Sequence, residues 1–134
     1  MPKVRIAFQV TGWIQEDPYD DAGPALSQTL VKKIFRGELK ADSEAKLLMC
    51  QADASNPKAG AGYVASEKVV GTLGGKEGSF VMQHWGVMGA DNPPVAKGHI
   101  IPESGTGELQ GISGTVEFSA DSEGAHELVL DYTL

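Results

Sequence analysis

The sequence is poor in cysteine and in basic residues, and both shortages limit what the protein can be. It contains one cysteine, Cys50, so no disulfide can form within the chain, and we expect a cytoplasmic protein. Its 11 lysines and arginines are scattered along 134 residues, and the formal net charge is −7. Because nucleic acids and anionic membranes are both bound through clustered positive charge, we expect neither as a partner. No stretch approaches the ~20 apolar residues that a membrane-spanning helix needs.

Motifs for metal binding and for nucleophilic catalysis are also missing. The three histidines, His84, His99 and His126, are too far apart for a short-spaced metal motif, although a site assembled from distant strands stays open. No Gly-x-Ser-x-Gly elbow occurs, and Cys50 lies in an apolar run, which is typical of a small core residue. We therefore expect no metal and no cofactor.

Glycine and proline, with 17 and 7 residues, divide the rest of the chain into short segments that often alternate between apolar and polar residues. Residues 25–35 also fit one face of a helix, but their β-branched and aromatic residues favour a strand; residues 44–51 are compatible with either. Strands are predicted at residues 4–10, 25–35, 63–72, 79–88, 95–102, 115–120 and 127–133, with loops at 16–24, 53–60 and 91–94. This pattern predicts an all-β fold, a closed antiparallel barrel of about eight strands forming one domain over residues 1–134.

A glycine-rich pattern, Gly-x-Leu-x-Gly-x-x-Gly-Ser/Thr-apolar, occurs from Gly71 to Phe80 and again from Gly107 to Val116. Glycine readily adopts the positive φ angles of tight reversals, so we predict a hairpin at each copy. A phosphate-binding loop would need a helix after the glycines, whereas here β-forming residues follow.

Two polar residues stand out within the apolar strands. Glu67 lies on the strand face opposite Lys68, and His84 shares a face with Phe80 and Met82. If both enter the barrel from adjacent strands, they can approach closely and exchange a proton as an acid-base pair. The alternative is a purely structural hydrogen bond.

The predicted catalytic residues are therefore Glu67 and His84. The residues predicted to bind the ligand are Tyr63, Phe80, Met82, Gln83 and Trp13. The opposite face of residues 79–88, with Val81, Trp85 and Val87, would point outward. An exposed apolar stripe of this kind predicts a homo-oligomer, most simply a homodimer.

Several strings together resemble the bacterial domain-of-unknown-function family numbered 3224. They are Gly-Thr-Leu at 71–73, Gly-Ser-Phe-Val-Met-Gln-His at 78–84, Pro-Glu-Ser-Gly-Thr-Gly-Glu-Leu at 102–109 and Leu-Asp-Tyr at 130–132. The resemblance covers nearly the whole chain and implies a small stand-alone barrel like that of the allene oxide cyclases. Those plant enzymes close a ring in a fatty-acid epoxide without a cofactor, but none of their motifs is found here.

The resulting hypothesis is a barrel that binds an apolar small molecule in its lumen. Its enzymatic form is a cofactor-free isomerase or cyclase that uses Glu67 and His84. The alternative is a non-catalytic ligand carrier or an interaction module whose lumen is filled by its own side chains.

Overall fold

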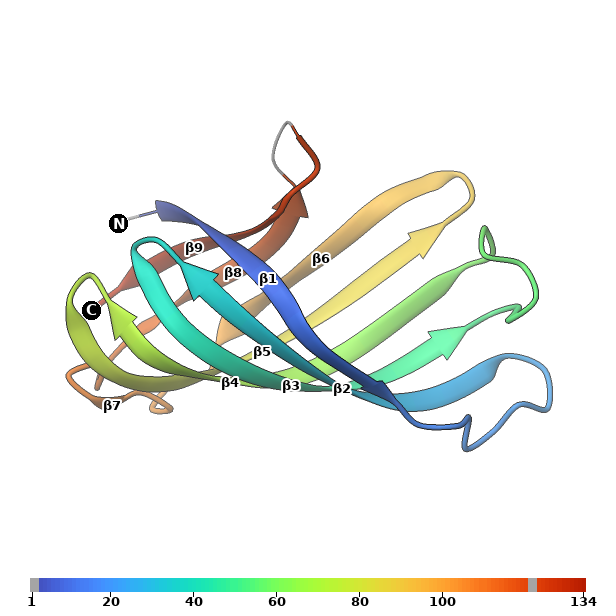
Figure 1. Ribbon diagram of the computed structural model, residues 1–134, viewed down its shortest axis with the longest axis horizontal. Helices are drawn as coiled ribbons and strands as arrows, with labels where there is room; N and C mark the ends of the chain where they lie inside the picture. Colours follow the sequence, from blue (N-terminus) through green and yellow to red (C-terminus); the bar gives the residue numbers. More distant parts are fainter. Residues whose placement is uncertain (1–2, 121–122) are drawn as a thin grey trace.

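The computed structural model describes residues 3–120 and 123–134, and every regular element in them is a β-strand (Figure 1). The strands are β1 (Lys3–Gln15), β2 (Ala25–Arg36), β3 (Leu39–Gln51), β4 (Ala61–Leu73), β5 (Lys76–Gly89), β6 (Asn92–Ile100), β7 (Thr106–Gly107), β8 (Ser113–Ala120) and β9 (His126–Thr133). Within these residues, no helix is long and apolar enough to cross a membrane.

The strands form one antiparallel sheet that closes on itself. Its order is β4-β3-β2-β1-β9-β8-β6-β5, and β5 pairs in turn with β4, which closes an eight-stranded barrel; the short β7 adds to the edge of β5. The predicted all-β barrel is therefore confirmed. The strand interpretation of residues 25–35 is also correct, and the ambiguous segment 44–51 belongs to strand β3.

The barrel is closed at one end of its strands and open along one side at the other end. β1 pairs with β9 only through residues 3–7, and β6 pairs with β8 only through residues 96–99. In the described part of the chain, the paired residues among 8–15 of β1 pair with β2 alone, and Asn92 and Val95 of β6 pair with β5 alone. We call this end, which lies at the right of Figure 1, the open half.

Side chains on the inner face form two apolar clusters along the barrel axis. The closed half holds the larger cluster, which includes Ile6, Phe35, Phe80, Met82 and Leu128, all with at most 1% of their surface exposed. The open half holds the smaller one, built from Val31, Ala45, Leu47 and Ala65, with Met49 and Tyr63 packed against it. The closed half is thus filled by its own side chains.

Two local predictions need correction. Residues 91–94 were predicted as a loop, but β6 begins at Asn92, because two prolines are tolerated where one strand edge has no partner. The second glycine pattern is not a hairpin between paired strands. β7 pairs with β5, whereas β8 pairs with β6 and β9. The first copy does form the predicted hairpin of β4 and β5, with Gly74 and Gly75 at φ angles of 58° and 82°.

Candidate functional site

Four consecutive strands each place one polar side chain on the inner face, between the two apolar clusters. They are Lys33 of β2, Ser43 of β3, Glu67 of β4 and His84 of β5. Along each strand, the polar residue separates two inner-face neighbours. One of these neighbours lies in the closed half, and the other lies in the open half. Because barrel strands are tilted, contacts run diagonally between neighbouring strands, and the four side chains converge at one level of the barrel. We call them the polar layer.

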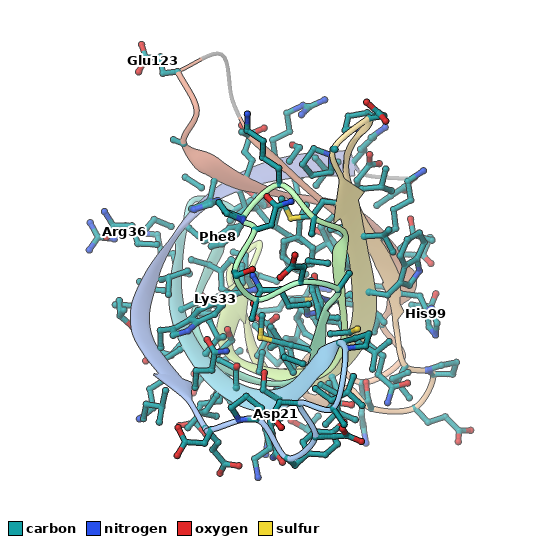
Figure 2. The ribbon with its side chains drawn as sticks, turned by 90° about the vertical axis from the view of Figure 1, so that its right-hand side faces the viewer. Phe8, Asp21, Lys33, Arg36, His99 and Glu123 are labelled. Carbon is teal, nitrogen blue, oxygen red and sulfur yellow. The ribbon has the colours of Figure 1, made fainter. Side chains whose placement is uncertain are left out.

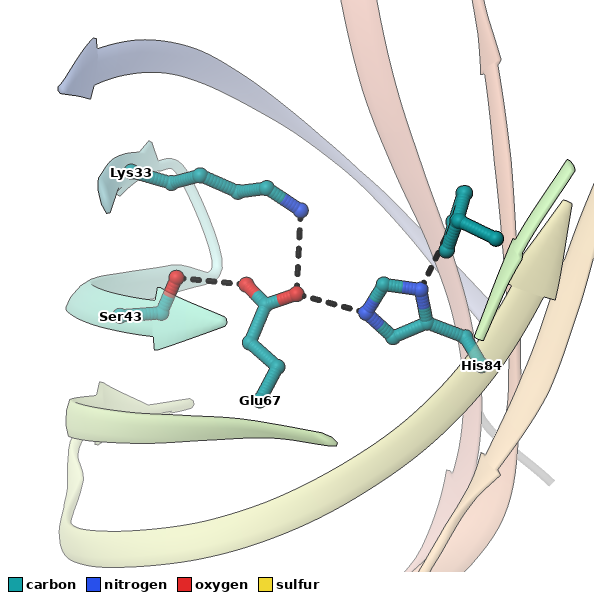
Figure 3. Close-up of polar contacts among 5 residues, drawn as sticks. Lys33, Ser43, Glu67 and His84 are labelled. Atoms are coloured by element: carbon teal, nitrogen blue, oxygen red, sulfur yellow. Dashed lines mark hydrogen bonds and ion pairs between the residues drawn. The ribbon is translucent and has the colours of Figure 1, made fainter. Parts of the chain in front are cut away.

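Glu67 is the centre of the polar layer (Figure 3). Its Oε1 accepts hydrogen bonds from Lys33 Nζ at 3.0 Å and from His84 Nε2 at 2.8 Å, and its Oε2 accepts one from Ser43 Oγ at 2.5 Å. The Glu67 side chain is fully buried. A buried carboxylate is stable only when it is paired and hydrogen-bonded, and these three donors meet that requirement.

The environment of Glu67 fixes its charge. Burial raises the pKa of a carboxyl group, but the hydrogen bond from His84, the positive charge of Lys33 and the hydrogen bond from Ser43 outweigh burial and lower the pKa of Glu67 to about 2. Glu67 is therefore ionised at neutral pH and is a weak base. Since an ionised carboxylate only accepts hydrogen bonds, the Nε2 atom of His84 must carry a hydrogen.

His84 connects Glu67 to Tyr63. The hydroxyl of Tyr63 lies 2.8 Å from His84 Nδ1, and the two rings meet edge to face with centroids 5.4 Å apart. Burial and the negative charge of Glu67 raise the pKa of Tyr63, so its hydroxyl stays protonated. Gly86 makes room for the ring, because a Cβ atom at this position would lie 2.7 Å from Tyr63 Cε1.

Aromatic rings shield the ammonium group of Lys33. Its Nζ lies 4.5 Å from the centre of the Phe118 ring and 5.0 Å from that of Phe8. The π-electron faces of both rings attract the ammonium group. This attraction replaces part of the hydration that Lys33 loses on burial. Figure 2 shows Phe8 and Lys33 inside the barrel and Arg36 and His99 pointing away from it. Lys33 thus supplies the positive charge beside Glu67.

The predicted proximity of Glu67 and His84 is confirmed; their catalytic roles remain predictions. Tyr63 lies beside His84 at the floor of the open half. Trp13 pairs with Val31 and so faces inward, yet it is 52% exposed, because the barrel wall is incomplete there.

The structure places the other three predicted ligand contacts away from the open half. Phe80 and Met82 face inward but are completely buried in the core of the closed half, which leaves no surface for a ligand. Gln83 faces outward, because strand residues alternate between the two faces, and its side chain donates to Ser66 Oγ at 2.9 Å.

Lys33 and Ser43 were not predicted as site residues. Strand alternation is the available signal, but it leaves Lys32 and Lys33 equivalent, because each alternates with apolar residues and only the register of β2 separates them. Lys33 falls in the inner series with Val31 and Phe35, and Ser43 falls between Ala41 and Ala45. A lysine in the apolar series of a strand needs a buried acidic partner, and Glu67 was available.

Residues 3–120 and 123–134 contain no group of three or more His, Cys, Asp or Glu side chains that could hold a metal ion. The ammonium of Lys33 occupies the position beside Glu67 that a cation would take.

The outer face of the barrel carries a separate depression of about 600 Å³. Its apolar lining includes Leu48, Val64 and Trp85, which are 51%, 56% and 44% exposed. These residues sit side by side on β3, β4 and β5, because Leu48 pairs with Val64 and Val64 pairs with Trp85. We call them, with Val87, the outer apolar patch.

Comparison with known proteins identifies the family. A family model described as a protein of unknown function (DUF3224) matches residues 5–132. The chain belongs to the DUF3224 family. A crystal structure of a DUF3224 protein of unknown function from Shewanella oneidensis MR-1 is 37% identical to it, with a TM-score of 0.87 and coverage of 100% of this chain and 97% of that one. No curated protein matches the chain. The family resemblance seen in the sequence is thus confirmed. The crystal structure of the Shewanella protein also shares the barrel fold of this chain.

Proposed function

We propose that this DUF3224 protein binds a small apolar molecule in the open half of its barrel, with Tyr63 as the polar contact. One observation carries the proposal. A hydrogen-bonded chain runs from Glu67 through His84 to the hydroxyl of Tyr63, and it ends beside apolar side chains of the inner face. Binding sites typically combine an apolar lining with a few oriented polar groups, and this arrangement has both.

Exposure along the inner face supports access from solvent. Val10 pairs with Lys33 and Trp13 pairs with Val31, so both face inward, and they are 42% and 52% exposed. Tyr63 and Met49, on the floor of the open half, are partly exposed. Apolar side chains that face inward and remain exposed are suited to cover a ligand.

Within this proposal, Glu67 and Lys33 orient the site and do not contact the ligand. Their side chains are buried, and the lowered pKa of Glu67 makes it a poor proton acceptor. The proposed function is therefore ligand binding, and a role of Glu67 and His84 in isomerisation or cyclisation remains a prediction. The alternative of an interaction module is favoured by one observation, the filled core of the closed half.

We further propose that two copies associate through the outer apolar patch. Leu48, Val64, Trp85 and Val87 are between 44% and 56% exposed on adjacent strands. A contiguous apolar surface of this kind is typical of a subunit interface, and a two-fold dimer is its simplest form.

The ligand site is tested with N-phenyl-1-naphthylamine, a neutral probe that fluoresces in apolar surroundings. Met49 and Leu48 are neighbours on β3, the first facing inward and the second outward. We expect saturable binding that is abolished by Met49→Lys and preserved by Leu48→Lys. The reverse pattern would place the probe on the outer apolar patch and would contradict the proposal.

A further inference from the structure

We propose that the ligand of the open half is a neutral molecule that donates a hydrogen bond, such as an alcohol or a phenol, to the oxygen of Tyr63. The inference rests on the proposed function and specifies the chemical class of ligand that the site accepts. It follows from the direction of the hydrogen bonds along Glu67, His84 and Tyr63 and from the charges around them.

The direction of the chain is set at its buried end. Ionised Glu67 only accepts, so His84 Nε2 donates to it at 2.8 Å. In the neutral imidazole the other ring nitrogen, Nδ1, then has no hydrogen and accepts from the hydroxyl of Tyr63 at 2.8 Å. The single hydrogen of Tyr63 is thereby used. Its oxygen keeps its acceptor capacity, so a ligand must supply the next hydrogen.

The charges around the site favour a neutral ligand. Lys33 and Glu67 form an ion pair at 3.0 Å, so their charges cancel, and the rings of Phe8 and Phe118 flank the ammonium. The polar layer therefore offers an anionic ligand no unpaired ammonium group, and burying the anion beside it would be unfavourable.

Four uncharged polar side chains on β1 and β2 in the open half already have partners. Trp13 donates to Gln15, Gln15 donates to Ser27, and the hydroxyl of Thr29 contacts Met49 Sδ at 2.9 Å. The oxygen of Tyr63 is the acceptor at the end of the hydrogen-bonded chain from Glu67.

The direction of the chain can be reversed by protonating His84. The titratable groups that face His84 are Glu67 and Tyr63 from β4, with Lys33 of β2 bound to the same carboxylate oxygen. β8 contributes the uncharged ring of Phe118, and the residue of β6 opposite His84 is Gly98. A protonated His84 donates from both nitrogens, so Tyr63 then accepts from it and turns its own hydrogen toward the ligand.

The test compares 2-naphthol, which donates a hydrogen bond, with 2-methoxynaphthalene, which only accepts. Affinities are measured by titration calorimetry near neutral pH with the wild type and Tyr63→Phe, which keeps the ring and removes the hydroxyl. We expect 2-naphthol to bind about three- to tenfold more tightly than the ether to the wild type and equally tightly to the variant.

The outcomes separate this inference from the proposed function. If both probes bind the wild type equally well, or if Tyr63→Phe keeps the preference for 2-naphthol, the inference is overturned and ligand binding stands. If neither probe binds, the proposed function is overturned and the inference with it. Binding of the ether by the variant shows that the variant is folded.

Discussion

Lys33 Nζ lies 3.0 Å from Glu67 Oε1 inside the barrel, and the two side chains are 8% and 0% exposed. An ion pair at this depth has lost most of its hydration, so each charge depends on the other. The same carboxylate orients His84 and, through it, the hydroxyl of Tyr63. The stability of the ion pair and the geometry of the proposed ligand site are therefore linked.

Loss of Lys33 should destabilise the protein strongly. Lys33→Met removes the ammonium and leaves Glu67 with an uncompensated charge, which typically costs about 3–5 kcal/mol. Urea unfolding measures this change. Lys32→Met is the matched control, because Lys32 is its neighbour on the outer face, its side chain is 51% exposed, and it lies 3.5 Å from Glu44. An exposed pair contributes at most about 1 kcal/mol, so equal losses in the two variants would contradict the account.

Stability should fall in acid because of Glu67. Its pKa is lowered from 4.5 to about 2 in the folded protein, so the unfolded chain binds more protons between these values. The resulting stabilisation, on the order of 3 kcal/mol, is fully present above about pH 5 and is lost as the pH falls toward 2. Unfolding free energies of the wild type and Glu67→Gln, measured across this range, should converge with falling pH. Parallel curves would show that the carboxylate is not stabilised as described.

The tautomer of His84 is open to direct measurement. Because Nε2 donates to Glu67, a long-range ¹H–¹⁵N spectrum near neutral pH should show His84 protonated at Nε2 and unprotonated at Nδ1. Tyr63→Phe should leave Nε2 protonated, since the contact with Glu67 remains. A signal from the Nδ1-protonated neutral form would reverse the chain of hydrogen bonds and remove the basis for a donating ligand.

The two tryptophans test the proposed association. Trp85 is 44% exposed on the outer face, and Trp13 is 52% exposed on the inner face. Sedimentation velocity at micromolar concentration should show a dimer for the wild type and for Trp13→Glu, and a monomer for Trp85→Glu. A charged residue buried in an apolar interface raises the free energy of association far more than one at its margin. A monomeric wild type, or a dimer that tolerates Trp85→Glu, would rule out this interface.

Strand alternation explains why the barrel and the central pair could be predicted. Glu67 and His84 stand out because their own strands are otherwise apolar on that face. The contribution of Lys33 was hidden in the sequence, because Lys32 and Lys33 are adjacent and only the register of β2 decides which one is buried. Local pattern identifies the faces of a strand, whereas pairing determines which side chains meet.

The open half could not be predicted for a related reason. A strand pattern does not reveal how many residues find a partner on both edges, and β1 pairs with β9 through five of its residues only. Phe80 and Met82 were accordingly assigned to an accessible wall, whereas they fill the closed half. Whether one half of the barrel is filled by its own side chains or open to solvent depends on where neighbouring strands end. The strand ends are a property of the whole sheet.

The most direct test of the account is to locate a bound probe by nuclear Overhauser effects. With N-phenyl-1-naphthylamine bound, we predict contacts to the Met49 methyl group and to the ring of Tyr63, which pair across β3 and β4 on the inner face. Contacts restricted to the methyl groups of Leu48 and Val64, which pair on the outer face, would place the ligand outside the barrel. That result would contradict a binding site in the open half.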